Sequence, residues 1–357
     1  MRFTFTLLCL CLSLFAFSQI QRGDHIITLS GPGASSYGAQ SSTAGDLGGI
    51  LFDFDTEVSQ FSLQPTYGYA LTDRWVVGGA LGITSSRYPA SAGSGDLNYW
   101  DVRLNPYVRY YAVNHERFGL FGQIGTGLGA NKNGVYGLEE LNLRGGLQFP
   151  LLAGIRVGPT LDYTIRNRNN YLTLGGTIEI VLNRASGEEG KPTAGFKAGS
   201  IMLGSQLLQA TSTRSILTGA VNVGGHYFLT DRFAAGLSVG AGGGRYDLGT
   251  AANDRSFRTS QMSASLSGRY YFTTNRNLVW YGEAGIGVGR LAYRSDVALG
   301  DLPIDRNDFS VFGGVGAQWF LRENLALETG VKINRNLVND SWGTAVSVPV
   351  GVRFFLR

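Results

Sequence analysis

The sequence predicts an all-β protein whose strands close into transmembrane, antiparallel up-and-down β-barrels. Apolar and polar residues alternate with a period of two along most of the chain, glycine accounts for 52 of the 357 residues, and only 16% are charged. The alternating segments are about 9 to 13 residues long, which suits a tilted strand crossing a bilayer. After residue 18, no stretch of eighteen residues is wholly apolar, which excludes a helical membrane protein.

The segment from Trp100 to Tyr110 shows how the two strand faces differ. Every second residue from Trp100 is apolar, whereas the residues between them include Arg103 and Arg109. A soluble barrel would turn the apolar face inward, and a membrane barrel would turn it outward. Charges and glycines on one face, bulky side chains on the other and aromatic residues near strand ends favour the outward arrangement. A closed barrel also leaves no unpaired strand edge in lipid.

The first eighteen residues have the layout of a cleaved secretory signal. Arg2 is followed by an almost unbroken apolar run from Phe3 to Phe17, and small residues stand at Ala16 and Ser18. The run is short for a membrane-spanning helix of about 20 residues. Both cysteines lie inside this segment, so we expect an exported mature chain without disulfides or thiol chemistry.

The chain contains an internal duplication. Tyr69 to Gly78 reads Tyr-Ala-Leu-Thr-Asp-Arg-Trp-Val-Val-Gly, and a similar decapeptide begins at Tyr227. An Arg-Tyr-Tyr triplet starts at Arg109 and again at Arg269. Matches that keep their order, with slowly growing spacing, indicate a duplicated unit. We predict a signal peptide over 1–18, a first eight-stranded barrel over 19–183, a periplasmic linker over 184–195 and a second eight-stranded barrel over 196–357.

The strand count also fits one sixteen-stranded barrel made from both halves. Inward glycines and balanced inward charges favour narrow, filled barrels, and the polar linker is longer than the other short turns, so we expect the tandem arrangement. The partner of residues 172–182 discriminates between the two architectures. In the tandem this strand pairs with the first strand, near residues 26–29; in the single barrel it pairs with residues 199–208.

Three features carry a resemblance to a known family. These are the Tyr-x-Leu-Thr-Asp-Arg-x-x-x-Gly hairpin, the Gly-x-Gly-x-Gly strands and the final alternating strand that ends at Phe355. They resemble the small OmpA-type outer-membrane β-barrels of Gram-negative bacteria, and the composition is similar to members from the Bacteroidota. The resemblance implies a bacterial outer-membrane location, contact with outer-membrane lipid and, during biogenesis, the barrel-insertion machinery as a partner. The chain departs from the family's usual aromatic last residue, because Leu356 and Arg357 follow Phe355.

Charged residues on the predicted inward faces are the first candidates for a functional site. We expect a barrel-interior charge network of Arg103, Arg109, Arg144, Arg156, Asp162, Glu179, Arg269, Glu283, Glu328, Lys332 and Arg353. One interpretation is a mutually paired polar core, because an isolated buried charge costs several kcal/mol. The other is a pore lining that selects ions. The paired core is the interpretation we favour.

Aromatic residues near strand ends predict contact with the membrane interface. The expected girdle consists of Tyr67, Tyr69, Trp75, Tyr227, Phe233, Trp280 and Trp319.

The sequence offers little that could carry catalysis. An enzyme of this fold needs a general base near the loop-side rim, but His25, His115 and His226 all fall at the predicted periplasmic end. No cofactor motif or metal-ligand pattern is visible, and the scattered charge of +4 does not predict nucleic-acid binding. We therefore expect a non-enzymatic protein with a structural role or a loop-bound extracellular ligand. The alternative is a porin-like diffusion channel formed by a single sixteen-stranded barrel.

Overall fold

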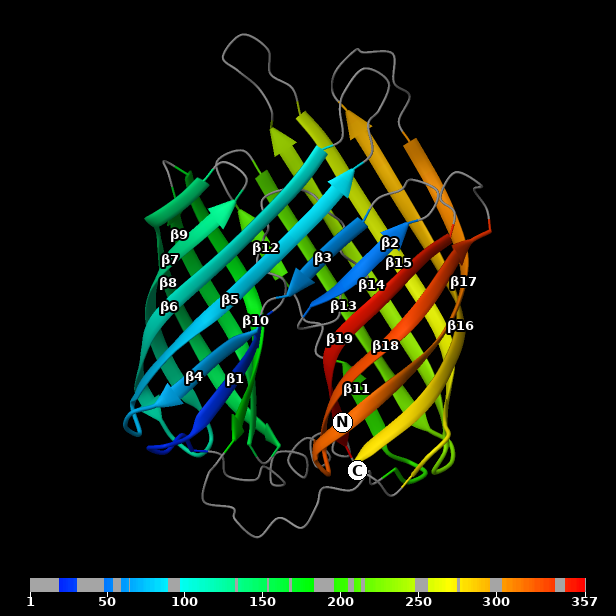
Figure 1. The fold of residues 1–357 in the computed structure, drawn as a ribbon, viewed down its shortest axis with the longest axis horizontal. Helices are drawn as coiled ribbons and strands as arrows, with labels where there is room; N and C mark the ends of the chain where they lie inside the picture. Colours follow the sequence, from blue (N-terminus) through cyan, green and yellow to red (C-terminus); the bar gives the residue numbers. More distant parts are fainter. Residues whose placement is uncertain are drawn as a thin grey trace, which may run out of the picture.

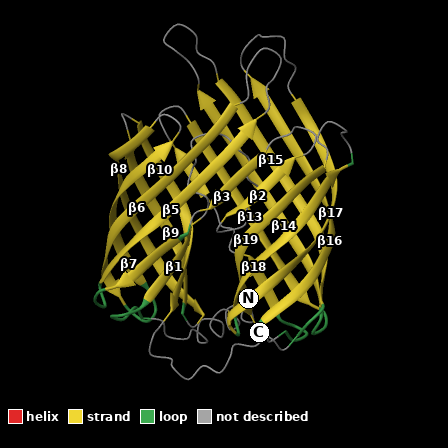
Figure 2. Ribbon diagram, viewed as in Figure 1, coloured by secondary structure: helices red, strands yellow, loops and turns green. Residues whose placement is uncertain are grey.

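The computed structural model describes residues 19–30, 48–53, 59–63, 65–88, 97–131, 134–152, 154–166, 169–182, 196–204, 209–212, 216–247, 256–274, 277–295, 304–337 and 344–356. Within them the chain forms nineteen strands of one connected sheet (Figures 1 and 2). No helix in this described part is long and apolar enough to span a membrane. The predicted signal peptide (1–18) and linker (184–195) lie outside the described residues.

The strands fall into two sets that follow the two sequence repeats. The first set is β1 (His25–Ser30), β2 (Gly48–Asp53), β3 (Ser59–Leu63), β4 (Thr66–Ala70), β5 (Trp75–Tyr88), β6 (Leu97–Asn114), β7 (Gly119–Asn131), β8 (Gly134–Leu152), β9 (Ile155–Arg166) and β10 (Asn169–Leu182). The second set is β11 (Ile201–Gly204), β12 (Gln209–Ser212), β13 (Ile216–Phe228), β14 (Phe233–Asp247), β15 (Ser256–Tyr271), β16 (Leu278–Ser295), β17 (Ile304–Arg322), β18 (Leu325–Asn336) and β19 (Thr344–Leu356).

In the lower half of the molecule each repeat closes on itself. β1 lies between the lower parts of β10 and β4, so that Ile27 pairs with Ile180 on one side and Tyr67 on the other. β11 occupies the same place between β19 and β13. The first barrel consists of β1 and β4 to β10, and the second of β11 and β13 to β19 (Figure 1). The predicted fold class of two closed eight-stranded antiparallel barrels is confirmed.

In the upper half the two repeats share one ring of strands. β12 joins β10 to β13, and Leu174 of β10 lies opposite Ala210 of β12. β2 pairs with β19, where Ile50 lies opposite Val348, and its other neighbour is β3, which pairs with β5. The paired strands run from β2 through β3, β5 to β10, β12 and β13 to β19, and return to β2. We call these sixteen upper strand parts the collar.

The collar adds pairings between the repeats that the tandem prediction did not include. Residues 177–182 of β10 pair with β1, as the tandem arrangement predicts, but residues 172–175 of the same strand pair with residues 209–212. The first strand position of each repeat is therefore split between two segments. The lower segment closes its own barrel and the upper segment pairs with the last strand of the other repeat. Within the described residues, this exchange pairs the first and last strands of each repeat at both levels, and a membrane barrel needs such closure.

The lower parts of the two barrels also pack against each other. An apolar cluster joins outward-facing residues of β1, β9 and β10 to outward-facing residues of β18 and β19. Its buried members are Leu29, Ile155, Ile178, Ile180, Leu325, Val352 and Phe354. We call this cluster the seam. Arg322 adds a polar contact across it, since its Nη2 donates to the backbone oxygen of Val181 at 3.3 Å.

Away from the seam, apolar side chains cover the outside of both barrels, as the alternation predicts. On β6, Leu104 is 50% exposed while Arg109 is 1% exposed. On β14, Leu237 and Val239 are likewise exposed. A continuous apolar exterior with charges inside is the arrangement of a transmembrane barrel.

Strand lengths differ from the sequence-based expectation. β8 and β17 each contain 19 residues, more than the expected 9 to 13. β7 continues to Asn131 and β8 begins at Gly134, so both strands extend close to the reversal that joins them. Gly134 has a φ of +127°, a backbone conformation that favours glycine and permits a tight reversal. Apolar and polar residues alternate less regularly near the upper ends of these strands. The sequence pattern therefore did not predict the extra residues of β8 and β17.

Candidate functional site: the filled barrel interiors

A buried ion pair crosses the interior of the first barrel. Arg109 of β6 and Glu179 of β10 are 1% and 0% exposed, and Arg109 Nη1 donates to Glu179 Oε1. Tyr111 Oη donates to the other carboxylate oxygen of Glu179 at 3.1 Å, and Arg109 Nε donates to Gln123 at 2.9 Å. The guanidinium also lies 4.3 Å from the ring centroid of Phe121. Strands from opposite sides of the barrel are thus joined across the lumen.

The second barrel uses the corresponding arginine with different acidic partners. Arg269 donates to Glu283 at 2.5 Å and to Glu328 at 2.6 Å. Arg353, on the strand position that Glu179 holds in the first barrel, donates to Glu328 at 2.7 Å. The ring centroid of Tyr281 lies 4.0 Å from the Arg269 guanidinium. Both repeats therefore have a central arginine, but the acidic residues that pair with it lie on different strands in the two barrels.

The remaining predicted interior charges also lie on the inward faces. Arg103 is 2.5 Å from Asp101. Arg144 forms an ion pair with Asp162. Arg156, which is fully buried, donates to the side chain of Asn114 at 3.3 Å. Lys332 Nζ lies 3.6 Å from the ring centroid of Phe312. The structure thus brings the predicted residues together as two separate groups, one in each barrel.

Each barrel is closed at its lower end by a residue that precedes the first strand. Ile20 is fully buried in a cluster with residues that include Tyr111 and Phe121. Phe196 occupies the corresponding position below the second barrel, where its ring lies 4.2 Å from that of Tyr271 and 5.0 Å from that of Phe228. We call Ile20 and Phe196 the plug residues. They close the same end in both barrels.

The same turn geometry anchors both plug residues. Gly23 and Gly199 follow them by three positions and have φ values of +92° and +89°. The amide of Arg22 donates to Asp73 at 3.0 Å, and the amide of Ala198 donates to Asp231 at 3.0 Å. Both aspartates belong to the repeated Leu-Thr-Asp-Arg turn. The turn that identifies the repeat in the sequence therefore also fixes the plug.

Asp24 lies beside the first plug, outside the strands. It is 3% exposed, and its carboxylate accepts a hydrogen bond from the amide of Gln21 at 2.7 Å. Burial raises the pKa of Asp24, while the hydrogen bond from Gln21 acts in the opposite direction.

Several buried residues inside the two barrels were not predicted from the sequence. Gln148 and Gln318 are fully buried at related positions, and Gln318 Nε2 donates to Glu328 at 2.5 Å. Tyr111 and Tyr271 are also fully buried. The repeated Arg-x-Tyr spacing on the inward face could have identified the tyrosines. The plug residues lie outside any strand, so alternation gives no signal for them.

The predicted aromatic girdle lies outside the barrels near their lower ends. All seven members are at least 37% exposed: Tyr67, Tyr69, Trp75, Tyr227, Phe233, Trp280 and Trp319. Trp75 lies 4.8 Å from Tyr110, ring centroid to ring centroid. Amphipathic rings at this level suit a membrane–water interface.

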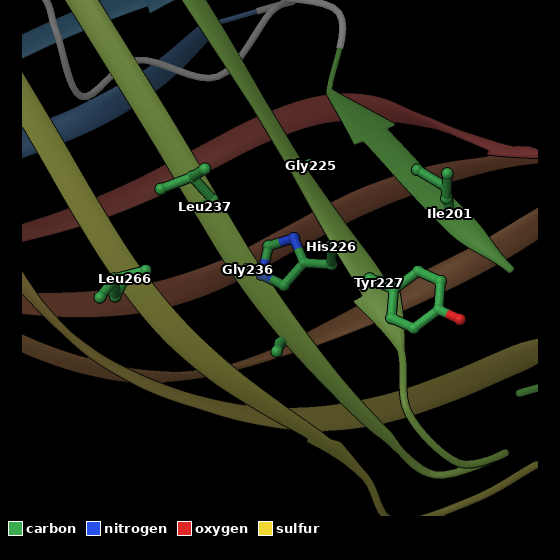
Figure 3. Close-up of a pocket in the computed structure, with 8 residues that line it drawn as sticks. Ile201, Gly225, His226, Tyr227, Gly236, Leu237 and Leu266 are labelled. Carbon is green, nitrogen blue, oxygen red and sulfur yellow. The ribbon is translucent and has the colours of Figure 1, made fainter. Parts of the chain in front are cut away.

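The three histidines lie near the lower ends of the barrels. His25 begins β1 and contacts the hydroxyl of Tyr67 at 2.5 Å, and His115 follows β6 in a short turn. His226 lies on β13, 3.2 Å from Ser267 Oγ and 3.8 Å from Glu283. Figure 3 shows its ring on the opposite side of β13 from Tyr227.

A shallow groove beside His226 is lined mainly by apolar side chains. Ile201, Tyr227, Leu237 and Leu266 lie around it, with Gly225 beside them (Figure 3). Among the described residues, no group of three or more His, Cys, Asp or Glu side chains could hold a metal ion. The geometry thus offers no assembled set of catalytic groups at this groove.

Comparison with known proteins relates the second barrel to a known family. The family described as "Outer membrane protein beta-barrel domain" matches residues 180–354, which span the second barrel. The N-terminal β-barrel domain of Pseudomonas aeruginosa OprF is 18% identical over 44% of this chain and 98% of that chain, with a TM-score of 0.28. Ail, the attachment invasion locus protein of Yersinia pestis, is 15% identical over 44% and 97%, with a TM-score of 0.27.

A longer match extends over both barrels. A bacterial polysaccharide outer membrane secretin is 10% identical over 94% of this chain and 99% of that chain, with a TM-score of 0.46. At these identities and TM-scores the structural likenesses carry no inference about ligand or transport. No curated protein matches the sequence.

The family match covers the second barrel, and both repeats have the β-barrel fold. Together they support the predicted outer-membrane location, and the signal peptide stays a prediction. The narrower OmpA-type resemblance and the Bacteroidota-like composition stay predictions.

Proposed function

We propose that this protein is a non-conducting outer-membrane scaffold without catalytic activity, whose twin barrels hold the loops of the upper rim at the cell surface. The observation that carries the proposal is the buried layer inside each barrel. Arg109 and Glu179 fill the first lumen, and Arg269 and Glu328 fill the second, with every one of these side chains at most 4% exposed. Such a layer leaves no wide aqueous path through the lower halves.

The interior charges support a structural role because they are paired. A charge lining a pore is solvated and available to ions, whereas Glu328 is held between Arg269 and Arg353 at 2.6 and 2.7 Å. Breaking a buried pair costs several kcal/mol, since it leaves an uncompensated charge. The plug residues add a second closure at the lower end of each barrel.

Single-channel recording in a planar bilayer tests the proposal. Protein extracted from outer membranes should insert without porin-like current steps, and its inserted state is checked by the difference in gel mobility between unheated and heated samples. A double variant, Arg109→Ala with Glu179→Ala, should introduce small steps by removing the layer from one barrel. Large, steady steps from the unmodified protein would overturn the proposal.

A diffusion channel is the second candidate, and the collar favours it. Sixteen strands enclose a wide ring at the upper end, as they do in porins. Below the collar, however, each barrel has eight strands, a size whose interior side chains can fill. If the collar leads into a channel, current should pass through the two narrow barrels below it. The recordings would then show paired small steps, and variants of one barrel would change only one step of each pair.

The role of the upper loops is tested in cells that lack the protein. Complementation by the full chain is compared with complementation by a variant in which residues 248–255 and 296–303 are replaced by short turns. A purely structural role predicts equal recovery of resistance to detergent. Recovery by the full chain alone supports a ligand bound by the loops. Replacement of all three histidines should leave either activity unchanged, and a loss would argue for catalysis.

A further inference from the structure

The lumen of the second barrel is open above its filled layer. In the layer, Glu328 is 4% exposed and Gln318 is fully buried. Four residues further up β18, Lys332 is only partly buried. Ser263 of β15 lies six residues above Arg269 and is exposed, although both residues are on the inward face of the strand. We call the part of the lumen from Lys332 upward the cup.

Lys332 places its charge inside the cup. Its Nζ lies 3.6 Å from the ring centroid of Phe312, on the inward face of β17. The end of this ring lies over Gly285 of β16, where an added Cβ would be 2.4 Å from the Cζ atom of the ring. Glycine at this position gives the ring room to lie across β16, so that the ring and the ammonium group both lie in the lumen.

The described charges at the level of the layer and Lys332 do not balance. They are Arg269, Arg353 and Lys332 against Glu283 and Glu328. Both carboxylates are already bound by arginine, at distances of 2.5 to 2.7 Å. One positive charge is therefore in excess, before any charge on His226 is counted. Because charges inside a protein need solvent or an opposite charge, an anion in the cup would complete the balance.

The first barrel balances the corresponding charge within the chain. When β9 and β10 are aligned with β18 and β19, Asp162 occupies the place of Lys332. The register partner of Asp162 is Arg144, and the two form an ion pair. The register partner of Lys332 is Gly314. The second repeat thus has a cation at this position and a residue without a side chain opposite it.

The first barrel also fills the space that the second leaves open. Large inward residues of β6 are replaced by serines at the same registers of β15, namely Arg103, Asn105 and Tyr107 by Ser263, Ser265 and Ser267. Tyr107 is 5% exposed, and its hydroxyl would lie 2.7 Å from a Cβ at Gly68. The position of Gly68 holds His226 in the second repeat, and Ser267 is partly exposed beside it. The cup is therefore a feature of the second barrel alone among the described parts of the two repeats.

We propose that the cup binds the oxyanion group of a small hydrophilic solute that enters from the upper rim. Lys332 supplies the opposite charge, and serine hydroxyls donate hydrogen bonds to the anionic oxygens. Ser267 pairs in register with Gly285, over which the Phe312 ring lies, so its hydroxyl and the ammonium group border the same space. The inference adds a ligand site to the proposed scaffold and rests on the filled layer, which closes the cup from below.

Binding of glucose 6-phosphate to the purified full chain tests the site. Calorimetric titration in neutral detergent compares it with inorganic phosphate and with glucose. We expect both phosphate-bearing ligands to bind and glucose to give no signal. Lys332→Gln should weaken glucose 6-phosphate binding by more than about tenfold, because it removes a charged hydrogen-bond donor. Lys332→Arg keeps the charge and should retain binding.

A variant that copies the first barrel keeps the charge but removes the space. His226→Gly with Ser267→Tyr should abolish binding, although Lys332 is unchanged. Lys197→Gln is the matched control, since it makes the same substitution at an exposed residue below the same barrel. It should leave binding unchanged, and gel mobility of unheated samples shows that each variant is folded. Full binding by Lys332→Gln, or an equal loss in Lys197→Gln, would overturn the proposal.

Liposomes that contain the full chain separate this site from the scaffold function. If glucose 6-phosphate binds but also crosses the liposome membrane, the site stands and the closed scaffold is wrong. If it neither binds nor crosses, the scaffold stands and the site is wrong. Binding without passage is the result expected from both.

Discussion

Leu174 of the first repeat lies in register opposite Ala210 of the second. Six residues further along the same strand, Ile180 lies opposite Ile27 of its own repeat. One strand thus pairs within its own barrel below and with the other repeat above. The reciprocal pair, Ile50 with Val348, does the same from the other side. The collar therefore joins the repeats through backbone hydrogen bonds as well as through the apolar seam.

Cysteine cross-linking should detect this exchange. Leu174→Cys with Ala210→Cys places two thiols opposite each other across neighbouring strands, at a separation near that of a disulfide. We expect an efficient intramolecular bond. Insertion of a protease site into residues 184–195 provides the measurement, because the cleaved halves should stay covalently joined on a denaturing gel.

A neighbouring pair supplies the control for register. Leu174→Cys with Thr211→Cys differs by one residue in register, and successive positions of a strand face opposite sides of a sheet. It should form little cross-link under the same oxidation. Equal cross-linking of both pairs, or none at Leu174 and Ala210, would contradict the observed exchange.

The sequence could predict faces but not this pairing. Period-two alternation places Arg109 inside and Leu104 outside, since it depends only on local positions. The exchange depends on which repeat supplies the neighbour of Leu174, and the two repeats offer similar edges. The acid that pairs with Arg109 is Glu179, 70 residues away, whereas Arg269 finds Glu328 on a different strand. The repeated sequence therefore predicts that each barrel has a central arginine. It does not predict which acidic residue pairs with that arginine.

Removal of Arg109 should destabilise the first barrel. Arg109→Ala leaves Glu179 buried without its partner, which costs about 3–5 kcal/mol in the free energy of unfolding. The measurement is denaturant unfolding in detergent followed by gel mobility. The double variant with Glu179→Ala should cost less than the sum of the single variants, because the two residues share one interaction.

An exposed pair provides the contrast. Arg290→Ala breaks an ion pair that is open to solvent on both sides, so no measurable loss of stability is expected. If Arg109→Ala and Arg290→Ala shift the unfolding midpoint equally, the buried layer does not stabilise the barrel.

Gly316 should tolerate no side chain. A Cβ at this position would lie 2.4 Å from the hydroxyl oxygen of Tyr281 and 2.7 Å from the backbone oxygen of Thr329. Gly316→Val must therefore displace the ring that covers Arg269, at a cost of about 1–3 kcal/mol. The change should appear in the unfolding midpoint and as altered tyrosine fluorescence.

Gly122 is the matched control for this substitution. It lies on the outward face of β7, and a Cβ there would meet no atom within 4 Å. Gly122→Val, the same substitution on the outward face, should leave the unfolding midpoint unchanged. A loss of stability as large as that of Gly316→Val would mean that strand flexibility, and not room for Tyr281, explains the glycines.

Phe196 should contribute to the stability of the second barrel, although it lies outside the strands. Its ring lies within 5.6 Å of the ring centroids of Phe228, Tyr271, Phe320 and Phe355. Phe196→Ala opens a cavity among these rings and should lower the free energy of unfolding by about 3–5 kcal/mol. Phe196→Leu retains most of the apolar volume and should recover much of that loss.

Closure of the lumen is tested by the same variant. If Phe196 contributes to the seal, Phe196→Ala should admit brief, small current fluctuations in a planar bilayer, while the inner layer around Arg269 still prevents steady conduction. Leu229→Ala, which removes a 53% exposed side chain from the adjacent turn, should change neither stability nor current. A silent Phe196→Ala variant with reduced stability would assign the plug to folding alone, because the layer above it would then suffice to close the barrel.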